Sequence, residues 1–328
     1  MGVSEQLLGQ LADGRFHSGE QLAQLLGVSR SAVWKQIQRL EAELGLDISA
    51  VRGRGYRLSS PLELLDAGRI RNELNHVARE RLEQLTLQSI TTSTNGCAVA
   101  DPPTQSGRAR AWLAEHQTDG RGRRGRQWVS AFGENLYLSI AWRFELPMSE
   151  LGGLSLVAGV VVAEALAQFG LEGQSLKWPN DVLVGGRKLC GVLIEVAGEA
   201  DGPSTAVLGV GVNFRLPEGQ GSKIDQPWID LSRSNAPAIS RNRLAGVLLD
   251  QLIEACREFS DGRLVPFLPR WNRFDHLRGQ LVRVVRGSKS SEGLYRGIAR
   301  SGAMLLEGPS GVSEYHAGEV SLRKGGVE

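Results

Sequence analysis

The chain has 328 residues, enough for about two domains and within range of three, and its net charge is only +2. Its hydrophobic (41%) and charged (23%) fractions are those of a globular protein, which excludes a disordered chain, a collagen-like repeat or a coiled coil over the whole length. No apolar run approaches the ~20 residues needed to cross a bilayer, and three widely spaced cysteines argue for a reducing cytoplasm and against a disulfide scaffold.

The first 58 residues predict three short helices followed by a hairpin. Ser18 opens a capping-box pattern for the second helix, and Ser29 is the predicted N-cap of the third, which ends at Gly45. The apolar positions of the third helix are spaced by four, three and four residues: Val33, Ile37, Leu40 and Leu44. A strand over 48–51, a glycine turn and a strand over 56–58 follow. This order is typical of a winged helix-turn-helix, in which the third helix and the glycine turn contact DNA.

Positive charge is concentrated on these two elements. Between Ser29 and Leu58 there are six basic and three acidic residues, and the acids lie near the end of the third helix. The candidate contacts to DNA are Ser29, Arg30, Ser31, Lys35, Arg39, Arg52 and Arg54. The alternative is a three-helix protein-binding module with a solvated basic face.

A boundary at Ser59-Ser60-Pro61 and a helical segment from Leu62 lead into a longer region of mixed pattern. The strands predicted there cover 112–115, 136–142, 182–184, 189–196 and 207–212, and the helices cover 154–168 and 243–259. The first of these helices is apolar on nearly every side, so we expect it to be buried. A Gly-Gly turn joins two of the strands as a hairpin. These elements favour an α+β core with an antiparallel or mixed sheet.

A third folded unit is predicted from about His276. Four short strands, separated by Gly and Ser turns, cover 281–285, 293–298, 303–306 and 319–322. Strands of this length and spacing fit a small β-barrel of SH3-like size.

The stretch Gly120–Arg126 holds four arginines in seven residues and matches the dinucleotide pattern G-x-G-x-x-G by letter. That pattern requires a helix directly afterwards, whereas here the chain runs through Gln127-Trp128 into the predicted strand at Leu136. A glycine-spaced arginine loop is better suited to wrapping an anionic ligand, because glycine lets the backbone approach and arginine donates to phosphate or carboxylate. The alternative is a disordered basic surface loop.

Three other clusters carry polar groups in patterns that suit a ligand. Lys177-Trp178-Pro179-Asn180-Asp181 places a lysine, an amide and a carboxylate within five residues, and Lys188 stands at a predicted strand start. Lysine offsets phosphate charge, and Asp181 suits a hard cation such as Mg²⁺. The run 91–95 offers small hydroxyl and amide groups at a predicted helix start. Nucleophile and zinc motifs are missing from the sequence, which favours electrostatic handling of phosphate over covalent catalysis.

Polar and glycine-rich motifs follow one another along the chain: Ser93-Thr94-Asn95, Gln117 with the arginine-rich stretch, Lys177–Asp181, Arg187–Gly191 and Gly211–Asn213. The order of these motifs resembles that of the biotin protein ligase family. The N-terminal winged helix resembles that of the bifunctional members, which also repress the biotin biosynthesis operon. The resemblance implies that biotin and MgATP form biotinyl-5′-adenylate, which then biotinylates a lysine of biotin carboxyl carrier protein. A lipoate-type ligase and a biotin-sensing repressor without turnover are the alternatives.

The resemblance also implies a role for individual residues. Catalysis is expected of Lys188, Arg121 and Arg123. Biotin is expected to contact these three together with Ser93, Thr94, Asn95, Gln117, Gly120, Gly122 and Gly191. ATP or the adenylate is expected to contact the same three with Arg126, Trp128, Lys177, Asn180, Asp181 and Asn213, and Asp181 is the expected Mg²⁺ ligand.

The fold implied by the resemblance is α+β with three domains. A winged helix-turn-helix covers 1–64, a catalytic domain like that of class II aminoacyl-tRNA synthetases covers 65–274, and an SH3-like domain covers 275–328. The expected partners are biotin carboxyl carrier protein, operator DNA and, in the presence of ligand, a second copy of the chain. No membrane partner is expected.

Overall fold

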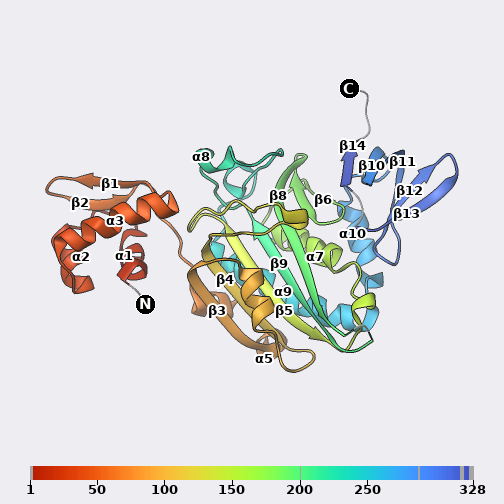
Figure 1. Cartoon of the computed structure of the whole chain (residues 1–328), viewed down its shortest axis with the longest axis horizontal. Helices are drawn as coiled ribbons and strands as arrows, with labels where there is room; N and C mark the ends of the chain where they lie inside the picture. Colours follow the sequence, from red (N-terminus) through yellow and green to blue (C-terminus); the bar gives the residue numbers. More distant parts are fainter. Residues whose placement is uncertain (1–2, 200, 287–288, 318–320, 325–328) are drawn as a thin grey trace.

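The computed structural model describes residues 3–199, 201–286, 289–317 and 321–324. Its strands form three sheets of two, seven and five strands, which follow one another along the chain (Figure 1). The predicted α+β architecture with three parts is confirmed. Among the described residues, no helix is long and apolar enough to cross a membrane.

The N-terminal part is the predicted set of three helices and a hairpin. Its elements are α1 (Val3–Leu11), α2 (Gly19–Leu26), α3 (Arg30–Leu44), β1 (Ile48–Val51) and β2 (Gly55–Leu58). The predicted caps are present: the Ser18 hydroxyl accepts from the Gln21 amide, and the Ser29 hydroxyl accepts from the Ala32 amide. Gly45 ends α3 with φ 65°, a left-handed conformation that glycine adopts without strain.

The segment 61–66 is extended, so the prediction of a helix from Leu62 is wrong. The next helix, α4 (Ala67–Asn72), begins only after its N-cap Asp66. The backbone amide of Leu62 donates to Ala12 O at 2.8 Å, and that of Leu65 donates to Glu115 Oε1 at 2.5 Å. These amides bond to distant acceptors, and the segment therefore links the winged helix to the central part.

The central part is a seven-stranded mixed sheet in the order β3-β4-β5-β9-β8-β7-β6, in which only β3 and β4 are parallel. The strands are β3 (Leu82–Thr91), β4 (Ala109–Gln117), β5 (Leu136–Phe144), β6 (Gln174–Lys177), β7 (Asp181–Val184), β8 (Arg187–Gly198) and β9 (Ser204–Val212). The helices are α5 (His76–Arg81), α6 (Thr94–Ala100), α7 (Leu154–Gln168), α8 (Glu218–Gly221), α9 (Arg241–Gly262) and α10 (Leu268–Phe274).

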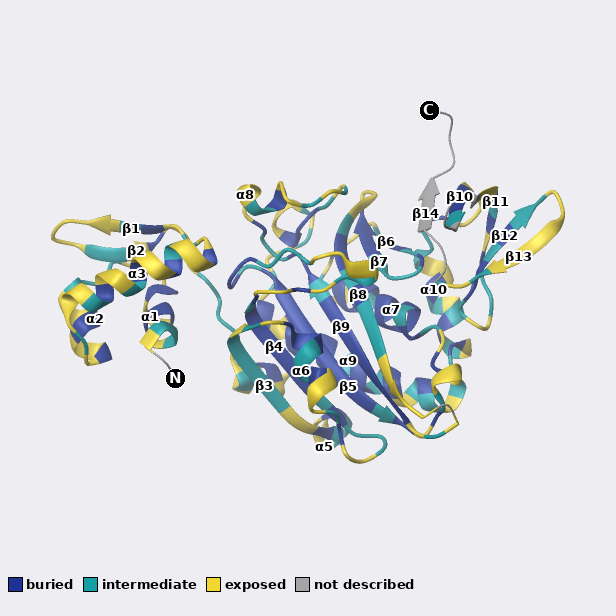
Figure 2. Cartoon of the chain, in the orientation of Figure 1, coloured by how far each residue is buried: buried dark blue, intermediate teal, exposed yellow. Residues whose placement is uncertain are grey.

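The two faces of this sheet differ. Leu136, Leu138 and Ile140 of β5 point into the main core with α7 and α9, and α7 is buried on nearly every side as predicted. The alternate residues of β5 point to the opposite face, which carries α6 (Figure 2). Strand β3 was not predicted: Leu85 and Leu87 alternate with polar residues and pack against the core, but the alternation is short and most of the strand is half-buried.

The C-terminal part is a five-stranded antiparallel sheet in the order β13-β12-β11-β10-β14. Its strands are β10 (Leu281–Arg286), β11 (Lys289–Ile298), β12 (Met304–Gly308), β13 (Gly311–Tyr315) and β14 (Ser321–Lys324). Strand β13 was not predicted, since nearly all of it is exposed and it has no apolar face. Of the strand predicted over 319–322, residues 319 and 320 lie outside the described residues, and the other two belong to β14.

One side chain of the central part is buried in the N-terminal core. Phe132, in the loop before β5, packs among the apolar residues of α1–α3 and is only 2% exposed. The carboxylate of Glu5 in α1 accepts a hydrogen bond from Ser89 of β3 at 2.8 Å. The winged helix is therefore docked on the central part, on the side of the loop that connects β4 to β5.

Candidate functional site

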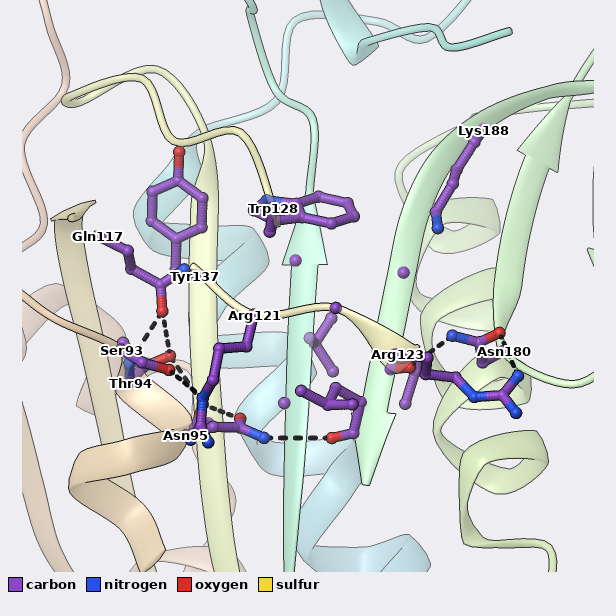
Figure 3. A pocket seen from close by; sticks show the side chains of 18 residues that line it. Ser93, Thr94, Asn95, Gln117, Arg121, Arg123, Trp128, Tyr137, Asn180 and Lys188 are labelled. Atoms are coloured by element: carbon purple, nitrogen blue, oxygen red, sulfur yellow. Dashed lines mark hydrogen bonds between the residues drawn. The ribbon is translucent and has the colours of Figure 1, made fainter. Parts of the chain in front are cut away.

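Two adjoining cavities lie on the α6 face of the central sheet, next to the loop that follows β4. We call residues 120–128 of this loop the arginine loop. Figure 3 shows the inner cavity. The inner pocket has a volume of about 60 Å³ and the outer pocket about 690 Å³. Both are lined by Arg123 and Trp128 of the arginine loop and by Asn180 and Lys188.

The inner pocket ends in a buried group of neutral polar side chains. Gln117 Oε1 accepts from the Thr94 amide at 2.8 Å and from the Thr94 hydroxyl at 3.1 Å. Ser139 Oγ lies 2.8 Å from Thr94 Oγ1 and 2.6 Å from Asn95 Oδ1. Ser93, whose hydroxyl caps α6, completes the group. Such an array of donors and acceptors fits a small neutral polar head group.

Ser139 was missed by sequence reasoning, although a signal was present. It is a polar residue in the middle of the predicted strand 136–142, on the opposite face from Leu138 and Ile140. Tyr137, which precedes it on the same face, also lines the inner pocket. Burial raises the pKa of Tyr137 to about 12, and its hydroxyl accepts from the Ala131 amide at 2.9 Å.

Glycines on β8 and β9 form the floor beneath these side chains. A Cβ at Gly211 would lie 2.7 Å from the Trp128 ring, and one at Gly191 would lie 2.9 Å from it. A Cβ at Gly209 would lie 2.0 Å from Asn95 Oδ1. These positions are therefore restricted to glycine, because Trp128 and Asn95 rest directly on the strand backbone.

The arginine loop is a tight turn and no helix follows it, as expected. The Gly122 amide donates to Arg126 O at 2.7 Å, and the Trp128 amide donates to Gly120 O at 2.8 Å. At Gly120 a Cβ would lie 2.7 Å from Trp128 O, so this end of the turn also needs glycine.

The two expected catalytic arginines point to different places. Arg121 reaches into the inner pocket and donates to Glu195 of β8 at 3.1 and 3.2 Å. Arg123 lies at the other side, where it donates to Asn180 Oδ1 at 3.3 Å (Figure 3). It also donates to the carbonyl of Ala317 in the C-terminal part. Sequence reasoning missed Glu195, which is separated from the loop by 74 residues.

Lys188 stands where the two pockets meet. Its Nζ is 2.7 Å from Asp181 Oδ1 and 5.6 Å from the centre of the Trp128 ring. Both members of the ion pair are largely shielded from solvent, with Lys188 at 15% and Asp181 at 18% side-chain exposure. Burial lowers the pKa of the nearby Arg123, and the charge of Asp181 opposes that shift. An anion that enters this junction meets two cations in a partly dehydrated site.

The outer pocket contains the other expected nucleotide residues: Arg126, Lys177, Asp181 and Asn213. Asn213 is buried, and its amide donates to Ile229 O at 3.1 Å. Part of the wall comes from the segment 220–228. The family resemblance implied that residues 215–225 close on the adenine, but their conformation could not be predicted from the sequence. Trp228 of the segment 220–228 packs on Gly221, where a Cβ would lie 2.0 Å from its ring.

The structure thus brings every expected biotin and nucleotide residue to the lining of one or both pockets. Gly120 borders only the outer pocket, and Gly191 and Asn95 border only the inner one. Within the described ranges, no group of three or more His, Cys, Asp or Glu side chains is placed to hold a metal. Asp181 is a single carboxylate beside a lysine.

The expected DNA-binding residues lie together on the N-terminal part, but they are not equally available. Arg30, Ser31 and Lys35 are exposed on α3. Ser29 is engaged as a cap, Arg39 pairs with Glu43 at 2.8 Å, and the Arg54 guanidinium lies 4.1 Å above the Phe16 ring. The remaining expected contact, Arg52, is exposed in the turn between β1 and β2. Trp34 was not predicted as a contact, yet it is 51% exposed on the same face of α3.

Family profiles match three stretches of the chain. The biotin/lipoate A/B protein ligase family matches residues 89–213, an HTH domain matches 3–57, and the biotin protein ligase C terminal domain matches 278–323. The chain is 40% identical to the bifunctional ligase/repressor BirA of Salmonella typhimurium, over 97% of this chain and 96% of that protein. It is 39% identical to BirA of Escherichia coli K12, over 98% of this chain and 97% of that protein.

Among solved structures, the chain is similar to a biotin protein ligase from Aquifex aeolicus in complex with biotin and ATP. The TM-score is 0.61 at 27% identity, and the match covers 74% of this chain and 100% of that one.

Proposed function

The chain belongs to the biotin/lipoate protein ligase family, and from this premise we propose that it joins biotin to a lysine of biotin carboxyl carrier protein in two steps. In the first step the biotin carboxylate attacks the α-phosphorus of ATP, and the bond to the β-phosphate breaks to release pyrophosphate. In the second step the acceptor lysine amine attacks the acyl carbon of biotinyl-5′-adenylate, releases AMP and loses a proton.

The observation that carries this proposal is the position of Lys188 and Arg123 between two pockets of different chemistry. The inner pocket ends in neutral hydrogen-bonding groups, which suit the ring system of biotin. The biotin carboxylate then points to the junction, where the α-phosphate gains negative charge during attack. Lys188, which pairs with Asp181 in the structure, is placed to take that charge, and such fixed donors contribute most in a water-excluded site.

The outer pocket suits the rest of ATP. Lys177 and Arg126 face the expected path of the phosphates, while Trp128 and Trp228 offer aromatic surfaces for adenine. The residues present also fit Mg²⁺, which commonly binds one or two carboxylates together with substrate phosphates, and Asp181 supplies such a carboxylate. The ion would offset phosphate charge during adenylation.

We also propose that the N-terminal domain binds operator DNA and that the adenylate complex does so as a dimer, with two winged helices facing a two-fold site. The exposed Arg30, Ser31 and Lys35 on α3 support this. We place the domain boundaries after residues 64 and 274, at the link before α4 and at the end of α10.

The test of the ligase proposal is a labelling reaction with ATP, Mg²⁺ and apo biotin carboxyl carrier protein, run in parallel with biotin and with lipoate. We expect one biotinyl group per acceptor by mass spectrometry, with equal amounts of AMP and pyrophosphate. Transfer of lipoyl in place of biotinyl groups would show that the inner pocket is misassigned. If the acceptor stays unlabelled with both biotin and lipoate, the ligase proposal is refuted, and the result favours a repressor without turnover.

A further inference from the structure

A chain of polar contacts behind the arginine loop is not required by the chemistry of ligation. It runs from Ser139 through Asn95 and Glu195 to Arg121. Asn95 Nδ2 donates to Glu195 Oε2 at 2.8 Å, and Arg121 donates to both carboxylate oxygens, from Nη1 to Oε1 at 3.1 Å and from Nη2 to Oε2 at 3.2 Å. Glu195 therefore links this chain to the arginine loop through two hydrogen bonds, while Arg121 Nε also donates a longer one to Ser93 Oγ, at 3.5 Å.

The far end of this chain is fixed by the sheet. Asn95 is 4% exposed, its Oδ1 accepts from Ser139 at 2.6 Å, and Gly209 leaves the space that its amide occupies. The oxygen of the amide is thus engaged, which aims Nδ2 at Glu195. The Glu195 carboxylate therefore accepts a hydrogen bond from the buried Asn95 amide on one side and forms a bidentate pair with the Arg121 guanidinium on the other.

The arginine loop has to open before a ligand enters. The inner pocket has a volume of about 60 Å³, whereas pockets that hold small organic ligands typically measure roughly 300–1,000 Å³. Arg121 and Trp128 of the loop are part of its lining, and Arg121 reaches into it (Figure 3). Whatever stabilises the closed loop also governs how fast ligand enters and leaves.

We propose that Glu195 holds the arginine loop closed. It is a positioning residue: it acts through Arg121 to keep the loop shut over the inner pocket and so retains the adenylate until an acceptor arrives. The inference deepens the proposed function, on which it rests. Because the Arg121–Glu195 pair is only partly exposed and is charge-assisted, its loss is expected to speed release of the adenylate by roughly 5- to 30-fold.

The test compares Glu195→Gln with Glu199→Gln in the full chain. Glu199 is an exposed carboxylate just beyond β8, so its variant is a matched control for loss of one charge. The complex with labelled biotinyl-adenylate is formed and then chased with excess unlabelled biotin. We expect faster release from Glu195→Gln, a higher KM for biotin and a single-turnover adenylation rate within about twofold of the wild type. Glu195→Asp, which keeps the charge, is expected to fall between the two.

Unchanged release of the adenylate from Glu195→Gln would overturn the proposal. A fall in the adenylation rate as large as the rise in the release rate would also overturn it, because that result indicates a disturbed site. A second readout does not depend on ligase activity. The amides of Gly122 and Trp128 are hydrogen bonded within the loop, and hydrogen exchange reports their opening. We expect roughly tenfold faster exchange in Glu195→Gln and no change in Glu199→Gln. Equal exchange in the Glu195→Gln and Glu199→Gln variants would refute this role of Glu195 even if the chain proved not to be a biotin ligase.

Discussion

Replacement of Phe132 by alanine should loosen the winged helix while sparing the ligase site. Phe132 follows the arginine loop, yet its side chain is 2% exposed within the N-terminal core. The backbone around Phe132 is held in place, so it cannot move inward to fill the space that the phenyl ring leaves in the N-terminal core. The Tyr137 hydroxyl holds the Ala131 amide at 2.9 Å, and Gly133 (φ 69°) packs on Leu62, where a Cβ would lie 3.0 Å from its Cδ1. The substitution therefore leaves a cavity.

The expected loss follows from that burial. Truncation of a buried phenylalanine to alanine costs about 3–5 kcal/mol, and the lower end applies at a joint between two domains, which relaxes more than a continuous core. A domain of this size is stable by roughly 3–9 kcal/mol, so a loss of about 3 kcal/mol is a large fraction of its stability. By native-state hydrogen exchange, protection of the amides in α3 should fall by roughly 100-fold.

Two comparisons make this result specific. Amides in β5 and α7 should keep their protection, and adenylation should continue, because neither Trp128 nor Lys188 touches the cavity. Gln127→Ala removes an exposed side chain between β4 and β5 and should leave the protection of α3 unchanged. If α3 exchanged at the wild-type rate in Phe132→Ala, the docking of the two domains through this side chain would be refuted.

Three further substitutions test the site. Lys188→Ala should slow pyrophosphate release by roughly 100- to 1,000-fold with the fold intact, since it removes the cation at the α-phosphate and leaves Asp181 unpaired; near-normal turnover would refute the assignment. Arg123→Gly should release adenylate early, seen by mass spectrometry as biotin on unrelated lysines; strict labelling of one acceptor would count against it. Gly211→Ala should displace the Trp128 ring, from which its Cβ would be 2.7 Å away, and raise the KM for ATP; calorimetric titration with ATP checks this, and an unchanged affinity would contradict the place given to Trp128.

Local rules in the sequence predicted most elements whose signals are self-contained. The caps at Ser18 and Ser29, the apolar helix 154–168 and the Gly-Gly hairpin need no distant partner, and all are present. The prediction of a helix from Leu62 was wrong because amides of the segment 61–66 bond to Glu115 and Ala12, which are far away in the sequence. Strand pairing depends on such long-range contacts. In β3 only Leu85 and Leu87 alternate with polar neighbours, a signal too short to identify a strand of 10 residues.

The site shows the same limit. Glycine-rich and charged clusters pointed to the residues of the arginine loop and to Lys188, because ligand chemistry constrains residue type. Ser139 and Glu195 are ordinary residues within strands, and only the sheet brings them to Asn95 and Arg121. The different directions of Arg121 and Arg123 follow from their distant partners and could not be inferred from their spacing.

The proposed ligase places two substrates against Lys188 and Arg123 at the junction of the pockets. The most direct measurement mixes the purified chain with biotin, ATP and Mg²⁺, without acceptor, and examines the protein by mass spectrometry under native conditions. We expect protein-bound biotinyl-5′-adenylate and one equivalent of released pyrophosphate. Bound biotin with no adenylate and no pyrophosphate would contradict the ligase proposal.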